Sequence, residues 1–141
     1  KQASDFVTRV DRECEEVIVS FIKNKFPEHS FLAEESIRET SKACRWIIDP
    51  LDGTTNYIHQ YPTFSVSIAL EVDAEVVLGV ILDPMRGEMF HAEKGKGAFL
   101  NGMQVKISPD DISASSLITT GFPFRSKHMI DLYLEAFKNI F

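Results

Sequence analysis

Residues 46–56 read WIIDPLDGTTN, and this stretch decides how the rest of the sequence is interpreted. Its apolar start leads directly into two acids, Asp49 and Asp52, which predicts a buried strand that delivers carboxylates at its end. Carboxylates are hard oxygen ligands, and Pro50 stiffens the expected turn between them, so both acids can converge on one small cation. The backbone carbonyl of Leu51 offers a further oxygen. The stretch therefore predicts a cation site at the end of a strand.

The residues that follow the acids suit an anion. Gly53 removes a side chain where an anion approaches the backbone, and the amides around Gly53, Thr54 and Thr55 are expected to open a helix toward phosphate. Cation ligands beside an anion seat suit phosphate ester hydrolysis, in which one metal prepares a water and another, about 3.5 to 4 Å away, steadies the leaving oxygen. The alternative is an ordinary loop in which Asp49 and Asp52 cap turns and a threonine caps a helix. Spacing alone leaves both interpretations open.

A second acidic pair, Glu34-Glu35, also follows directly on a short apolar run, residues 31–33, that is consistent with a buried strand. These carboxylates can face the same pocket as the first two acids, which favours the cation site over the ordinary loop. Taken alone, the pair is more typical of a solvated loop edge. The polar stretch at residues 36–45 predicts a surface loop between the two acidic segments.

Two amphipathic helices are predicted toward the ends of the chain. From Thr8 onward apolar residues recur at helical spacing, and Pro27 follows where that helix has stopped. The expected stripe of this first helix consists of Val10, Cys14, Val17, Ile18, Phe21, Ile22 and Phe26. After a break at residues 121–125, a second stripe consists of Ile130, Tyr133, Leu134, Phe137 and Phe141.

The middle of the chain predicts antiparallel strands. Period-two alternation and turn residues give expected strands at residues 64–72, 76–82, 88–93 and 104–108, separated by turns at 73–75, 84–87 and 101–102. Strands and helices segregate along the sequence rather than alternate. This favours an α+β fold, a layered sandwich of a mainly antiparallel sheet with helices.

Composition indicates one globular domain, residues 1–141, because 44% of the 141 residues are hydrophobic and 26% are charged. The formal net charge of −6 shows no broad footprint for nucleic acid or an anionic membrane, so neither is an expected partner. No apolar run approaches the roughly 20 residues of a membrane span, and residues 1–11 lack a signal-peptide core. A cytoplasmic location is therefore expected. Cys14 and Cys44 lack ligand spacing and are expected to be free thiols.

The glycine-rich GKG segment and the histidines are not expected to form a ligand site. The GKG at residues 95–97 is expected in a hairpin rather than a nucleotide loop, because no third glycine follows at the position that a nucleotide loop requires and the surroundings are typical of a hairpin. The four histidines have no partner at ligand spacing and are expected at the surface or as caps: His29, His59, His91 and His128. Both chain ends look cut, since the sequence opens at Lys1 without a methionine and closes at Phe141 within a helical pattern.

Two motifs resemble the metal motifs of the inositol monophosphatase family. They are LAEES at residues 32–36 and, after a variable loop, WIIDPLDGTTN at residues 46–56. Further segments extend the resemblance over nearly the whole chain: DFVTRVD at 5–11, FSVSIA at 64–69, GKGAFLNG at 95–102, and GFPFR at 121–125, which resembles the bacterial branch. The resemblance implies that the chain is the N-terminal half of this fold. The C-terminal half, with a further metal carboxylate and most of the residues that grip the sugar, is then absent.

The resemblance also implies a ligand set for two to three magnesium ions. Glu34, Asp49 and the Leu51 carbonyl would hold the first ion, and Asp49 and Asp52 would share the second. Glu34 would also help a third, looser ion. The residues expected to bind substrate through these ions and the adjoining backbone are Glu34, Leu51, Asp52, Gly53 and Thr54.

The catalytic residues implied by the resemblance are Asp11, Glu34 and Thr54. Thr54, paired with Asp11, would orient and deprotonate a metal-bound water, while the amides of Gly53 and Thr54 hold the phosphate. A metal lowers the pKa of its water, and a short relay from hydroxyl to carboxylate can take the proton. Lys1 resembles a family lysine that contacts metal-bound water, but it stays outside the predicted site.

The function that the resemblance implies is magnesium-dependent hydrolysis of a phosphate monoester, with myo-inositol 1-phosphate as the expected substrate and water as the direct attacking group. Lithium sensitivity and a homodimer are implied as well. Fructose-1,6-bisphosphatase and nucleotide 3'-phosphatase of the same superfamily are alternatives. An alternative of another class is a binding protein that keeps the fold and docks on protein or RNA machinery. Its signature would be a lost metal ligand or a basic face, and the sequence shows neither.

Overall fold

The computed structural model describes residues 8–35, 43–107, 117–123 and 126–140. One compact unit spans Phe6–Lys106, and the other comprises Lys1–Asp5 and Ile107–Phe141. The first unit contains α1 (Arg9–Lys25), β1 (Ser30–Ala33), β2 (Cys44–Asp52), α2 (Thr54–Ile58), β3 (Ser65–Val72), β4 (Glu75–Asp83), β5 (Glu88–Glu93), β6 (Gly97–Leu100) and β7 (Met103–Val105). The second contains the 3-10 helix η1 (Lys127–Met129) and α3 (Ile130–Ile140).

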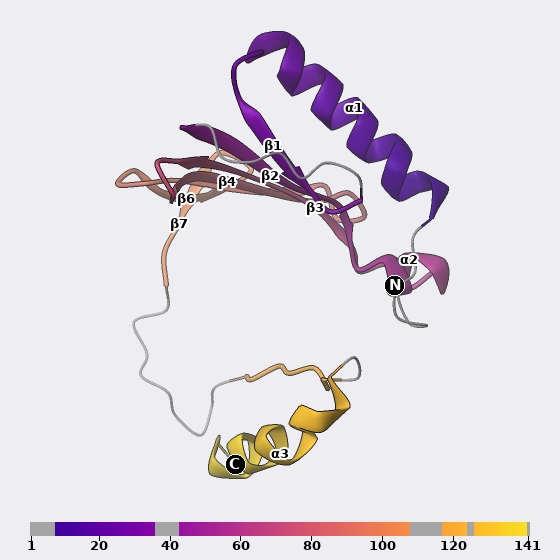
Figure 1. Ribbon diagram of the computed structural model, residues 1–141. Helices are drawn as coiled ribbons and strands as arrows, with labels where there is room; N and C mark the ends of the chain where they lie inside the picture. The colour runs from indigo at the N-terminus through magenta and orange to yellow at the C-terminus, as the bar shows by residue number, and fades with distance from the viewer. Residues whose placement is uncertain (1–7, 36–42, 108–116, 124–125, 141) are drawn as a thin grey trace. The chain divides into compact units, whose positions relative to one another are not determined.

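The strands of the first unit form one seven-stranded sheet in the order of the sequence, β1 to β7 (Figure 1). β1 is parallel to β2, and every other neighbouring pair is antiparallel. This confirms the predicted α+β fold with a mainly antiparallel sheet. The parallel pair matters for the site, because strands that run in the same direction end at the same edge. The acids after β1 and the acids of β2 are thereby brought to one edge of the sheet.

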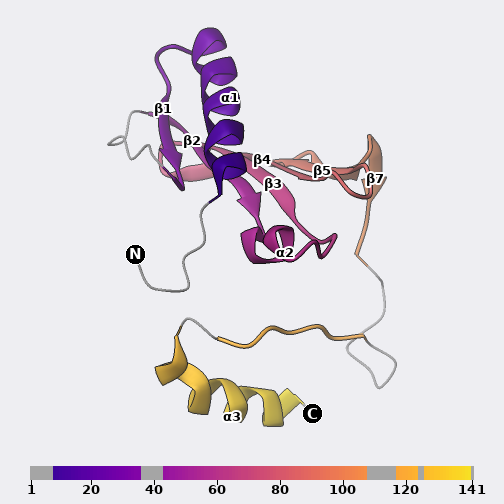
Figure 2. The same cartoon turned by 90° about the vertical axis from the view of Figure 1, so that its right-hand side faces the viewer.

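α1 lies along one face of the sheet, over its first strands (Figures 1 and 2). The core between helix and sheet consists of Val19, Ile22, Phe31, Ala33, Trp46 and Ile48. The helix begins with a capping box, in which Thr8 Oγ1 accepts from the Asp11 amide at 3.3 Å and the Asp11 carboxylate accepts from the Thr8 amide at 2.9 Å. This box fixes the Asp11 carboxylate at the start of α1.

The buried face of α1 differs from the predicted apolar stripe. Val17 and Phe21, which the pattern places in the stripe, are 69% and 62% exposed. The buried residues of the helix are instead Asp11, Glu15, Val19 and Ile22. Ile22 of the predicted stripe is buried and Ile18 packs against the core, so the stripe is right in part. Two positions of the buried face carry carboxylates, which hydrophobic periodicity alone does not reveal.

β2 is longer than the predicted run at residues 46–48 and includes the acids themselves. Pro50 lies within this strand, so the predicted turn at Pro50 is wrong. Asp49 pairs with Ser67 and Asp52 with Ser65, and the register shifts between these two positions. Such a bulge re-aims side chains at the end of a strand. α2 follows at once, as predicted, and extends from the end of β2 (Figure 2).

Several smaller predictions are corrected or confirmed. The expected loop at residues 36–45 is too long, because Cys44 and Arg45 belong to β2, and residues 36–42 lie outside the described residues. The last strand ends at Val105 rather than at residue 108, which also lies outside them. The predicted hairpin at residues 95–97 is confirmed, because β5 and β6 are antiparallel neighbours across it.

Two histidines do not lie at the surface or in caps as predicted. His29 is half-buried, where its Nδ1 accepts a hydrogen bond from Trp46 Nε1 at 2.9 Å and its ring stacks on Phe26. His91 is also half-buried and stacks on Phe99. Stacking on aromatic rings explains both placements. The spacing of the histidines in the sequence does not reveal these contacts. Both cysteines are free thiols, as predicted.

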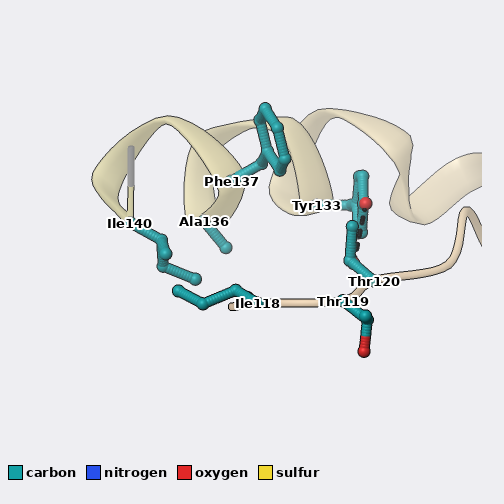
Figure 3. A pocket seen from close by; sticks show the side chains of 7 residues that line it. All are labelled: Ile118, Thr119, Thr120, Tyr133, Ala136, Phe137 and Ile140. Carbon is teal, nitrogen blue, oxygen red and sulfur yellow. Dashed lines mark hydrogen bonds between the residues drawn. The ribbon is translucent and has the colours of Figure 1, made fainter. Parts of the chain in front are cut away.

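The second unit is built around α3, which confirms the predicted second helix. The Tyr133 hydroxyl lies 3.0 Å from Thr120 Oγ1 and links α3 to the extended segment before it. Side chains of this segment and of α3 line a cavity of about 360 Å³ (Figure 3). None of the predicted site residues lines this cavity. In the described parts of the chain, no helix is long and apolar enough to cross a membrane.

Candidate metal and phosphate site

Two of the three predicted catalytic residues, Thr54 and Asp11, are in contact just beyond the end of β2. Thr54 Oγ1 lies 3.1 Å from Asp11 Oδ1 and 3.0 Å from the Leu51 carbonyl oxygen, so one hydroxyl proton is offered to two acceptors. Asp11 is 2% exposed, and its second carboxylate oxygen accepts from the Thr8 amide and hydroxyl. Asp11 and Thr54 are 43 positions apart in sequence, and the fold places them in direct contact.

The Glu34 and Asp49 carboxyl groups share a hydrogen bond where β1 and β2 end. The Glu34 amide donates to the Ile48 carbonyl at 3.2 Å, which fixes Glu34 beside the strand that carries Asp49. Asp49 Oδ1 in turn accepts from the Leu51 amide at 3.1 Å. The structure therefore brings the Glu34 and Asp49 carboxyl groups and the Leu51 amide together.

The crowded carboxylates change the acidity of both groups. Partial burial, the Asp49 carboxylate and then the charges of Glu35 and Asp11 raise the pKa of Glu34 from 4.5 to about 7. Burial also raises the pKa of Asp49, with the Asp52 charge acting in the same direction and the Leu51 amide opposing it. The pair thus holds a proton near neutral pH when no cation is bound.

We expect the affinity of this site for a divalent cation to fall as the pH drops below 7, because the cation must displace the proton that Glu34 holds. One competing proton gives a loss of about tenfold per pH unit below the pKa. The same shift stabilises the metal-free fold fully below pH 4.5, and that stabilisation is lost as the pH rises through about 7.

Manganese titrations by calorimetry at pH 6, 7 and 8, in two buffers of different ionisation enthalpy, measure both the affinity and the protons released. Glu34→Gln is the control, because the glutamine side chain has no carboxyl proton that a cation could displace. An affinity that stays constant from pH 6 to 8 would contradict the shared proton.

Gly53 connects the acids to α2 and has a left-handed backbone conformation, which other residues rarely adopt. Its φ is +94°, and a Cβ built there would meet the Thr63 carbonyl oxygen at 3.1 Å and Phe64 Cα at 3.3 Å. The Tyr57 amide makes the first helical hydrogen bond, to the Gly53 carbonyl at 3.0 Å. The amides before Tyr57 therefore precede the helical ladder and are placed to bind an anion.

We expect Gly53→Ala to lower the free energy of unfolding by about 1–3 kcal/mol, through backbone strain and the contacts with residues 63–64. Gly87→Ala is a matched control, because Gly87 also has a positive φ, +65°, but nothing lies within 4 Å of its Cβ position. Urea unfolding of both variants separates strain from crowding. An equal loss in both would show that the close approach at Gly53 contributes nothing.

Four of the predicted site residues line two hollows of the first unit, each of about 350 Å³, whereas Asp11, Leu51 and Thr54 line neither. Glu34 and Asp49 line one, together with Ser67 of β3. Asp52 and Gly53 line the other, which is also bordered by Arg86. Asp52 thus belongs to the same strand end as Asp49 but faces a different hollow. Residue Lys1 lies outside the described residues.

The donor set fits magnesium in its chemistry. Among the described residues, no three or more His, Cys, Asp or Glu side chains form a group that could hold one ion. The available ligands are instead the Glu34–Asp49 pair, the Leu51 carbonyl and, further along β2, Asp52. All are hard oxygens, which magnesium prefers, and the pair already shares a proton that a cation can replace. The chemistry of these oxygens is therefore compatible with a magnesium ion.

Sequence reasoning missed one residue that reaches this site. Glu15 is 2% exposed, and its Oε2 accepts from the Glu35 amide at 2.8 Å. The signal that could have found it is its spacing from Asp11, because residues four apart on a helix share one face. Once Asp11 is placed in the site, Glu15 is expected on the same side of α1.

Known proteins share the sequence of this chain over nearly its whole length. The sequence pattern that defines the inositol monophosphatase family matches residues 1–138. The chain is 40% identical over 143 residues to Nus factor SuhB of Escherichia coli K12, an alignment that covers 100% of this chain and 54% of that protein. The chain thus spans about half the length of the curated relatives it matches.

Solved structures match as well. The extragenic suppressor protein suhB of Bartonella henselae has a TM-score of 0.92 and 39% identity, over 99% of this chain and 54% of that chain. An IMPase of Thermotoga maritima has a TM-score of 0.73 and 44% identity, over 76% of this chain and 42% of that chain. The likeness therefore extends over the fold and the sequence together.

Proposed function

Because the chain belongs to the inositol monophosphatase family, we propose that it carries the metal and phosphate site of a magnesium-dependent phosphatase that hydrolyses a phosphate monoester, with myo-inositol 1-phosphate as the substrate. The observation that carries this proposal is the contact of Thr54 Oγ1 with buried Asp11, at the end of the strand that holds Asp49. A hydroxyl held between a carboxylate and a carbonyl is suited to receive and pass on a proton.

In this proposal the chain's own oxygens hold the cations. Glu34, Asp49 and the Leu51 carbonyl would hold the first magnesium ion, Asp49 and Asp52 would hold the second, and Glu34 would help to hold a third. Magnesium, when bound, supplies an acidified water and offsets the charge of the phosphate. Displacing the proton shared by Glu34 and Asp49 makes their carboxylates available as ligands, which links binding to pH.

Proton transfer is assigned to Thr54 and Asp11. Thr54 Oγ1 donates its proton toward Asp11 Oδ1, so its lone pairs are oriented to accept a proton from the attacking water. Asp11 is held by the Thr8 amide and by burial, so the acceptor does not move during the transfer. The amides of Gly53 and Thr54, ahead of the helical ladder of α2, bind the phosphate oxygens.

Lithium inhibition, a homodimer and a cytoplasmic location belong to the same proposal. Fructose 1,6-bisphosphate and 3'-phosphonucleotides remain alternative substrates. Phosphate release from a panel of these three substrates by the complete protein, at saturating magnesium, tests the substrate assignment. The largest kcat/KM for inositol 1-phosphate supports it, and a larger value for either of the others reassigns the substrate.

A second function of another class is favoured by one observation, the name Nus factor that the 40% identical relative carries. That name assigns no phosphatase chemistry to the relative. It supports the binding-protein alternative, in which the fold docks on protein or RNA machinery. The site carboxylates Glu34, Asp49 and Asp52 are all present, which favours the enzyme. The expectation against nucleic acid rests on net charge alone, and the relatives do not support it.

A further inference from the structure

Glu15 is a buried carboxylate that the proposed mechanism does not use. It lies one helical turn after Asp11 on the buried face of α1 and is 2% exposed. Burial of a carboxylate costs free energy unless hydrogen bonds satisfy it. Glu15 Oε2 accepts from the Glu35 amide at 2.8 Å, an ordinary hydrogen-bond length. The helix thus contacts the backbone directly after Glu34.

This contact means that the peptide groups on both sides of the Glu34 Cα are hydrogen-bonded. On one side, the Glu34 amide donates to the Ile48 carbonyl of β2 at 3.2 Å. On the other side, the Glu35 amide donates to Glu15 of α1. Successive amides are therefore bonded to two different elements, and the position of the Glu34 side chain between them is restricted.

α1 also fixes the other half of the site. Asp11, four residues before Glu15, contacts Thr54 at the start of α2. One helix therefore contacts both parts of the site, at the Glu35 amide and at the Thr54 hydroxyl, through two carboxylates on the same face. The relative placement of Glu34 and Thr54 depends on this helix.

We propose that Glu15 is a positioning residue, which sets the affinity of the site for a divalent cation by fixing the backbone that carries Glu34. The proposal rests on the proposed function. Residues that hydrogen-bond behind a metal ligand typically change metal affinity by roughly 10- to 100-fold when they are removed. Positioning requires an acceptor at Glu15, whereas a purely electrostatic role requires its charge. The two roles are therefore separable by substitution.

The test compares Glu15→Ala, Glu15→Gln and the exposed control Glu16→Ala in the complete protein. Glu15→Ala is expected to weaken manganese binding, measured by calorimetry, by roughly 10- to 100-fold, with kcat at saturating magnesium reduced about threefold or less. Glu15→Gln, whose amide oxygen can still accept from Glu35, should recover most of the affinity, and Glu16→Ala should match the wild type. Circular dichroism verifies folding, and Glu15→Gln decides the question if Glu15→Ala does not fold.

Amide hydrogen exchange of the segment around Glu35 provides a readout that needs neither metal nor turnover. It should quicken in Glu15→Ala and stay slow in Glu15→Gln. Unchanged exchange and metal affinity in folded Glu15→Ala overturn the proposal, and so does a Glu15→Gln variant as weak as Glu15→Ala. A wild-type protein that neither binds manganese nor releases phosphate refutes the proposed function instead, while the exchange experiment still decides whether Glu15 fixes the segment.

Discussion

Asp49→Asn should lower the magnesium-dependent turnover of the complete protein by about 1,000-fold or more. Asp49 is assigned to both the first and the second magnesium ion, and an amide is a weaker ligand that carries no charge. Loss of the several kcal/mol that a bound metal contributes to the transition state corresponds to a rate loss of this size. Steady-state phosphate release across a magnesium titration measures it.

The fold of Asp49→Asn should persist, because the substitution removes one of the charges that raise the pKa of Glu34. Asp73→Asn is the matched control, since Asp73 is exposed in the turn between β3 and β4 and undergoes the same chemical change. Near-normal activity of Asp49→Asn at saturating magnesium would contradict the ligand assignment. An unfolding midpoint well below that of the wild type would mean that Asp49 has a structural role instead.

Thr54→Ala should lower kcat by roughly 100- to 10,000-fold, the range typical of general acid-base groups, while magnesium affinity changes little. The substitution removes the hydroxyl that contacts both Asp11 and the Leu51 carbonyl. The carboxylates assigned to the metal stay in place. Rates at saturating magnesium, with metal affinity measured by manganese calorimetry, separate the two quantities.

Thr54→Ser is the matched control for this prediction, because serine keeps the hydroxyl and loses only a methyl group. It should retain most of the activity. If magnesium affinity collapsed in Thr54→Ala while the rate at saturation survived, Thr54 would be a support for the metal site rather than a proton acceptor. Thr54→Ser as inactive as Thr54→Ala would show that the hydroxyl is not the functional group.

Much of the candidate site could be predicted from the sequence, because its residues cluster at ends of apolar runs. The run before Asp49 predicts a strand that delivers acids, and Gly53 before two threonines predicts the start of a helix. Both features are local, and the structure contains both. The contact of Thr54 with Asp11 came from the family resemblance, since no local rule connects residues so far apart.

The remainder depends on tertiary contacts that no short pattern encodes. The predicted apolar stripe of α1 wrongly includes Val17 and Phe21, which are exposed, because Asp11 and Glu15 occupy positions on the buried face. The bulge in β2 replaces the expected turn at Pro50, because pairing with β3 continues past Asp49. Parallel pairing of β1 with β2 joins the two acidic segments, and only the sheet itself shows it.

Phosphate release from inositol 1-phosphate by the complete protein, with magnesium, with a chelator and with lithium added, tests the central claim most directly. The account predicts release that requires magnesium and that lithium inhibits. Equal release in the presence of the chelator would contradict the metal mechanism. No release from inositol 1-phosphate, fructose 1,6-bisphosphate or 3'-phosphonucleotides would contradict the enzyme itself and favour the binding protein.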